Sequence, residues 1–140
     1  MKKGYTLVEL LAVIILLSII LGLVSINAIH YFNERKEKDY ENIKALIVDN
    51  SKVLVNSTSK NITKTVDYNL QHYGICKINV SDLVNYGLMD TETNNPLTNE
   101  SMSNTYVKVT IDDSSYDYVY EYIDQSDEIG IINCLEPISE

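Results

Sequence analysis

The chain has 140 residues, the length of one domain, and a formal net charge of −9. The negative charge is concentrated late: from Met102 to the end, Lys108 is the only basic residue, against nine carboxylates. Such a surface repels phosphate backbones, so we expect no nucleic acid to bind through it. We interpret it as a solubilising face. A loose calcium site at Asp124, Asp127 and Glu128 is a second interpretation, although a calcium loop normally has regular ligand spacing.

The first predicted element is a helix within one apolar block, residues 5–29, which contains a single charge and no proline. About 25 residues at 1.5 Å each give roughly 37 Å, enough to cross a hydrocarbon core of about 30 Å. A cleaved secretory signal fits less well. The block is longer than an ordinary signal core, and the best small-residue site, at 26–28, begins with the bulky Ile26.

Charge flanking this block leaves its orientation in a membrane open, because basic residues stand on both sides of it: Lys2, Lys3, Arg35, Lys36 and Lys38. The charge inside the block is Glu9. A carboxylate in an apolar span costs about 2.5–3.5 kcal/mol on insertion scales. The positive end of a helix explains how Glu9 is tolerated, but not why it follows Gly4 at this spacing.

The string Lys3-Gly4-Tyr5-Thr6-Leu7-Val8-Glu9, followed by the apolar run, resembles the class III signal of type IV prepilins and pseudopilins. The resemblance implies that a membrane aspartyl peptidase cuts between Gly4 and Tyr5 and that the new amine is methylated. It also implies that Glu9 pairs with the terminal amine of an adjacent subunit, which lessens the burial cost of both charges. Tyr5 stands where phenylalanine is commonest, and Gly22 is the only helix-weakening residue where many pilins have a proline.

This family likeness implies an α+β, pilin-like fold in which a long N-terminal helix packs on a small antiparallel sheet. Beyond a polar turn at 33–39, apolar residues recur at helical spacing and predict a helix to about Val55. A break at Asn33 is the alternative. We therefore divide the chain into a leader (1–4), a transmembrane or filament-core half-helix (5–30), an amphipathic half-helix (31–55) and an α+β head (56–140).

In the head, residues 56–65 read as a polar loop and Cys76 to Val80 as a short strand. Ser81 is the predicted N-cap of a helix that extends to Tyr86 and is ended by Gly87. The stretch 80–88, with Asn-Pro-Leu at 95–97, also resembles the middle of many Gram-positive pilins. The Asn-, Ile- and Lys-rich composition suggests a low-GC Gram-positive source of the clostridial type.

The last third predicts antiparallel strands at 106–111 and 116–123 around a turn, with 129–134 as a third candidate. Pairing Ile111 with Tyr116 places alternate tyrosines on the same face as the valines, against the helix. A tyrosine row exposed as an adhesive patch is the other interpretation.

Cys76 and Cys134 form a disulfide if the head lies outside the cytoplasm, and are two buried thiols otherwise. His30 and His72 are isolated, so we expect no metal and no cofactor. Because the chain has no Gly-rich phosphate loop, nucleophile elbow or motif-placed carboxylate pair, we expect no enzyme activity.

The leading hypothesis is a major or minor structural subunit of a type IV pilus, or of a related secretion- or competence-type filament, that polymerises through its N-terminal helix. The resemblance implies other pilin subunits, the prepilin peptidase, a platform protein, an assembly ATPase and the membrane as partners. The potential disulfide favours an external C-terminal head, so we expect a single-pass membrane protein that joins a cell-surface filament. The alternative is a monomeric, membrane-anchored extracellular binding module.

Overall fold

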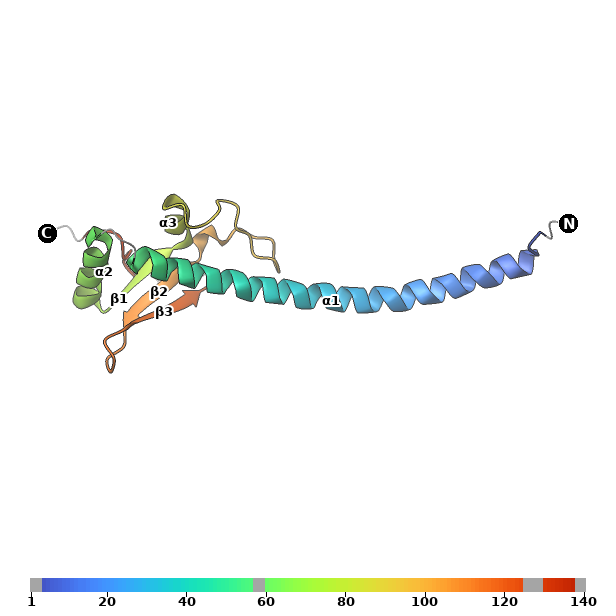
Figure 1. The fold of residues 1–140 in the computed structure, drawn as a ribbon, viewed down its shortest axis with the longest axis horizontal. Coiled ribbons are helices and arrows are strands. Elements are labelled where there is room, and N and C mark those ends of the chain that lie inside the picture. The colour runs from blue at the N-terminus through green and yellow to red at the C-terminus, as the bar shows by residue number, and fades with distance from the viewer. Residues whose placement is uncertain (1–3, 57–59, 125–129, 138–140) are drawn as a thin grey trace. The chain divides into compact units, whose positions relative to one another are not determined.

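The computed structural model describes residues 4–56, 60–124 and 130–137. Figure 1 shows a first, long helix followed by a sheet with short helices. The elements, in chain order, are α1 (Leu7–Asn56), α2 (Lys60–Tyr73), β1 (Ile75–Asn79), α3 (Val80–Asn85), the 3₁₀ turn η1 (Met102–Asn104), β2 (Tyr106–Ile111) and β3 (Tyr118–Ile123). The chain divides into two compact units, Met1–Lys38 and Asp39–Glu140. The α+β, pilin-like architecture expected from the sequence is confirmed.

Helix α1 is continuous through the polar turn, so the alternative of a break at Asn33 is wrong. No proline or glycine interrupts it beyond Gly22. Its last turns belong to the core of the second unit, where Ile47, Leu54 and Val55 are fully or almost fully buried. The predicted stripe therefore faces the core.

The core of the second unit lies between α1, α2 and one face of the sheet. Helix α2 contributes Val66 and Leu70, and the strands contribute Ile78, Val107 and Val109. At the edge of this core, the Tyr40 hydroxyl donates a hydrogen bond of 2.7 Å to Asp124 Oδ2, which ties α1 to the residue after β3. Burial, with this hydrogen bond, raises the pKa of Tyr40 above its usual value.

The expected polar loop at 56–65 is wrong for residues 60–65, which form the first turns of α2. Among these polar residues, Ile62, Val66 and Leu70 recur at helical spacing. Packing of that face on the core outweighs the weak helix propensity of Asn and Thr. Two threonine hydroxyls donate to nearby carbonyls: Thr63 to Val55 at 2.8 Å and Thr65 to Asn61 at 2.9 Å. The remaining loop positions, 57–59, lie outside the described residues.

Helix α3 begins two residues earlier than expected, because its N-cap is Asn79 and not Ser81. The Asp82 carboxylate accepts hydrogen bonds from the Asn79 backbone N–H at 3.0 Å and from its amide at 3.2 Å. Gly87 ends the helix as predicted, with a φ of +72°. The N–H groups of Gly87 and Leu88 bond back into the helix, which is the Schellman arrangement that a left-handed residue permits.

The sheet is antiparallel in the order β1-β2-β3. The observed register pairs Ile111 with Tyr118 and Val109 with Tyr120, so the predicted pairing with Tyr116 is wrong by two residues. A shift of two keeps every side chain on its face, and Tyr118, Tyr120 and Tyr122 do pack against the core. The difference arises because Tyr116 lies in the turn, with a φ of +60° and an 82% exposed side chain.

The predicted third strand at 129–134 is not a strand in its described part, residues 130–134. Instead, the segment is held beside β1 by an isolated bridge of Asn133 to Lys77 and by two backbone hydrogen bonds of Lys77. The buried Asn69 amide of α2 also donates to its carbonyls, reaching Cys134 at 3.0 Å. Cys76 and Cys134 are joined as a disulfide whose side chains are both buried.

We predict that replacing both cysteines, as Cys76→Ala with Cys134→Ala, destabilises the full-length protein by about 4 kcal/mol, the chain-entropy value for a loop of this length. Urea unfolding in detergent, followed by a head-specific signal, measures the change. The expected result is a lower midpoint and a larger m-value under non-reducing conditions, because the unfolded chain is no longer cross-linked and exposes more surface. Equal midpoints for the variant and the wild-type protein would contradict the prediction.

We predict that the head loses stability in alkali through its buried tyrosines. Burial raises the pKa of Tyr120 to about 12, and its hydroxyl has no hydrogen-bond partner among the described residues. A raised folded-state pKa means that stability is intact below the unfolded value of about 10 and falls as the pH rises toward 12. Tyr120→Phe should therefore lose less stability than wild type between about pH 10 and pH 12.

The matched control is Tyr116→Phe, because Tyr116 lies on the same hairpin but is largely exposed. This variant should follow the wild-type pH profile of unfolding midpoints. A Tyr120→Phe profile that also coincides with wild type would show that the Tyr120 hydroxyl does not limit alkaline stability.

Candidate processing and assembly site

The peptide bond between Gly4 and Tyr5 lies just before α1, in a segment with no regular secondary structure. Both residues are exposed, and the Tyr5 side chain is 84% exposed. Exposed, non-helical backbone of this kind is what proteases accept. A Cβ added at Gly4 would meet nothing within 4 Å, so the fold itself does not require glycine here. A requirement for glycine at this position must come from something that acts on the chain.

Glu9 and Thr6 form a reciprocal cap on the first turn of α1. The Thr6 backbone N–H donates to Glu9 Oε2 at 2.9 Å, and the Thr6 hydroxyl donates to the same oxygen at 3.1 Å. In return, the Glu9 backbone N–H donates to Thr6 Oγ1 at 3.3 Å. This is a capping box, which satisfies donors that a helix start leaves without partners. It also holds the carboxylate at the positive end of the helix dipole.

Thr6 is the residue of this site that the sequence reasoning missed. The signal was present, since Thr6-Leu7-Val8-Glu9 is a Ser/Thr-x-x-Glu/Gln pattern directly before an apolar run. Gly4, Tyr5 and Glu9 lie close together simply because they are near in sequence. The terminal amine that Glu9 is expected to meet belongs to another subunit, so its position does not follow from one chain.

Within the described part of the chain, nothing covers the apolar part of α1. Large side chains from Leu7 to Ile29 are more than half exposed. Its polar side chains are satisfied within the helix: Ser18 donates to Ile14 O at 2.8 Å and Ser25 to Leu21 O at 2.7 Å. Among the described residues, α1 is the one helix long and apolar enough to cross a membrane by length and composition. Such internal satisfaction suits surroundings without water.

Aromatic and charged side chains follow the apolar run. The Tyr31 and Phe32 rings meet edge to face at 6.4 Å, and the Arg35 guanidinium lies 5.0 Å from the Tyr31 ring centre. His30 and Glu34 approach to 3.2 Å. Tyrosine and arginine beside an apolar helix are typical of a membrane–water boundary.

The described part of the head offers no metal centre, because no three His, Cys, Asp or Glu residues in it are grouped to hold an ion. Asp127 and Glu128, two of the three residues in the calcium interpretation, lie outside the described residues. The site that stands out is therefore the start of α1.

Comparison with known proteins points to the same segment. The family model described as the prokaryotic N-terminal methylation motif matches residues 1–25. No curated protein and no solved structure matches the chain. The matched residues contain the Gly4–Tyr5 bond, the Thr6–Glu9 cap and most of the apolar run. Residues 1–25 are thus a type IV pilin-like prepilin signal, carried by a chain with a pilin-like α+β architecture.

Proposed function

We propose that this chain is a structural subunit of a type IV pilus or of a related secretion- or competence-type filament, and that it polymerises through α1. The observation that carries the proposal is the pairing of a prepilin signal with an apolar helix that has no protein cover. Before assembly, lipid covers this helix. After assembly, the corresponding helices of neighbouring subunits cover it, so each apolar surface is always shielded from water.

In this proposal, a prepilin peptidase removes residues 1–4, and the new amine at Tyr5 is methylated. Glu9 then meets the Tyr5 ammonium of a neighbouring subunit in the apolar core of the filament. An ion pair in such surroundings is worthwhile only if its geometry is good and its other lone pairs are satisfied. The two hydrogen bonds from Thr6 satisfy lone pairs of the Glu9 carboxylate. They also orient the carboxylate before the neighbour arrives.

We place the head outside the cytoplasm, as a cell-surface domain. The buried Cys76–Cys134 bridge supports this side, since structural disulfides persist in oxidising compartments. The platform protein and the ATPase belong to the proposal as partners that extract and drive the subunit. A monomeric membrane-anchored binding module differs in having no use for Glu9 and no need of cleavage.

The proposal is tested at its two defining positions. With a co-expressed prepilin peptidase, mass analysis should show the loss of residues 1–4 and the gain of a methyl group at Tyr5, and Gly4→Leu should stay uncleaved. Glu9→Ala should be cleaved but should not join filaments, because a buried ammonium without its partner costs about 3–5 kcal/mol. That cost corresponds to more than a tenfold loss of incorporation.

Glu9→Gln is the matched control for shape, because it keeps the size of the side chain and removes the charge. It should fail like Glu9→Ala if charge pairing is what matters. An intact N-terminus in the presence of an active peptidase, or wild-type yields of filament from Glu9→Ala, would overturn the proposal in favour of a monomeric anchor.

A separate prediction concerns Thr6. Thr6→Val keeps the shape of the side chain but removes the hydroxyl, which donates to the Glu9 carboxylate and accepts from the Glu9 backbone N–H. Thr6→Ser keeps the hydroxyl. Losing an N-cap costs about 0.5–2 kcal/mol, so we expect Thr6→Val to reduce filament yield less than Glu9→Ala does. Thr6→Ser should be close to wild type. Quantified sheared filaments, normalised to cleaved subunit, provide the measurement; equal yields for Val and Ser would contradict it.

A further inference from the structure

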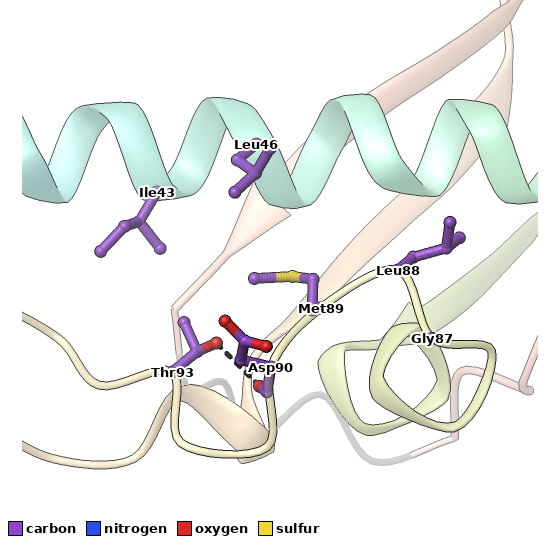
Figure 2. A pocket seen from close by; sticks show the side chains of 7 residues that line it. All are labelled: Ile43, Leu46, Gly87, Leu88, Met89, Asp90 and Thr93. Atoms are coloured by element: carbon purple, nitrogen blue, oxygen red, sulfur yellow. Dashed lines mark hydrogen bonds between the residues drawn. The ribbon is translucent and has the colours of Figure 1, made fainter.

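An apolar crevice opens between α1 and the loop that follows α3. Its volume is about 350 Å³, and Ile43, Leu46, Leu88 and Met89 supply its apolar walls. Figure 2 shows Ile43 extending from the helix into the space beside the loop, into which Met89 extends from the loop. Leu46 is 51% exposed, although an aliphatic residue of this size is usually covered. The crevice therefore presents apolar surface that the head does not itself fill.

The crevice is held open by hydrogen bonds, so it is formed before anything binds. The Asn50 amide donates to Leu88 O at 2.8 Å, which fixes the loop to α1. The Thr93 hydroxyl donates to Asp90 O at 2.9 Å and closes the far turn of the loop, as the dashed line in Figure 2 shows. A preformed crevice loses little conformational entropy when it is filled.

The rim of the crevice carries one negative charge. The Asp90 side chain is exposed, and none of the ion pairs of the described residues includes it. A partner that fills the crevice should therefore bring an apolar or aromatic group with a cation next to it.

One described segment of the chain has this chemistry. Phe32 and Tyr31 are 62% and 53% exposed, and Arg35 stacks on the Tyr31 ring without belonging to an ion pair of the described residues. Aromatic side chains and arginine are the groups that most often dominate the binding energy of protein interfaces. Tyr31, Phe32 and Arg35 form what we call the aromatic knob.

We propose that the aromatic knob of one subunit docks in the crevice of a second copy, with Phe32 against Met89 and Leu46 and with Arg35 beside Asp90. The knob and the crevice are different surfaces of the same chain, so their contact is heterologous. Contacts of this kind extend into open assemblies instead of closing into dimers. This proposal rests on the filament function above, to which it adds a second contact outside the apolar helix core.

The test is a cross-link in assembled filaments. The chain with Phe32→Cys and Met89→Cys is expressed with the prepilin peptidase, and intact filaments are treated with a mild oxidant. The native cysteines are buried in their bridge and leave the two new thiols as the reactive pair. We expect a ladder of covalent multimers on non-reducing gels, and a cross-linked peptide joining positions 32 and 89 of different subunits.

The matched control is Phe32→Cys with Val119→Cys. Val119 is 45% exposed, and it lies on the face of the sheet that points away from the core. This pair should give no ladder. A charge exchange provides a second readout: Arg35→Asp and Asp90→Arg should each lower filament yield several-fold, and the two together should restore it.

The outcomes separate the two proposals. Filaments that assemble without the 32–89 cross-link, or that give an equal ladder with the Val119 control, would overturn the docking contact and leave the filament function standing. A wild-type chain that is cleaved and never polymerises would overturn the filament function and the docking contact with it. Failed restoration by the charge exchange, together with a positive cross-link, would remove the Arg35–Asp90 pairing from the contact.

Discussion

The constraint on which the rest of this structure depends is the apolar surface of α1 from Leu7 to Ile29, which none of the described residues covers. At about 25 cal/mol per Å² of apolar surface, leaving such a helix in water would cost far more than a small head gains by folding. The helix therefore requires surroundings without water, and under the proposed function it passes from lipid to the helices of neighbouring subunits. The other features of the N-terminus are consistent with such a passage.

Backbone and side-chain polarity set the second condition for this passage. Ser18, Ser25 and Asn27 each donate to a carbonyl of the preceding turn, so they impose no demand on lipid or on a neighbouring helix. Glu9 is different, because a carboxylate has more hydrogen-bonding capacity than one turn can satisfy. Thr6 takes up part of that capacity, and the remainder gives Glu9 a reason to seek a cation. The cap and the proposed assembly role are thus complementary uses of one side chain.

Sequence reasoning worked where one local pattern dominated. The apolar run, the glycine that ends α3 and the alternation of β2 were each strong enough to be read directly. It failed where distant packing decided the outcome. Residues 60–65 have the composition of a loop, but Ile62 and the following Val66 pack on the core and favour a helix. Residues 130–134 have strand-like side chains, but they pair with β1 through a single bridge. The Thr6–Glu9 cap follows a sequence pattern that predicts it, but the interpretation of Glu9 rested on an amine of another subunit and not on Thr6.

The packing of the head is compatible with the change in the surroundings of α1 that the proposed function requires. Its buried residues come mainly from α1, α2, α3, β1 and β2, the tyrosines of β3 pack against them, and Cys76 and Cys134 join β1 to the C-terminal segment. Since the last turns of α1 are part of that core, the helix cannot leave the head without unfolding it. None of the described residues before the polar turn belongs to the core, so under the proposed function they can exchange lipid for neighbours. In that proposal, stability and assembly draw on different parts of the same helix, and a subunit can fold first and polymerise later.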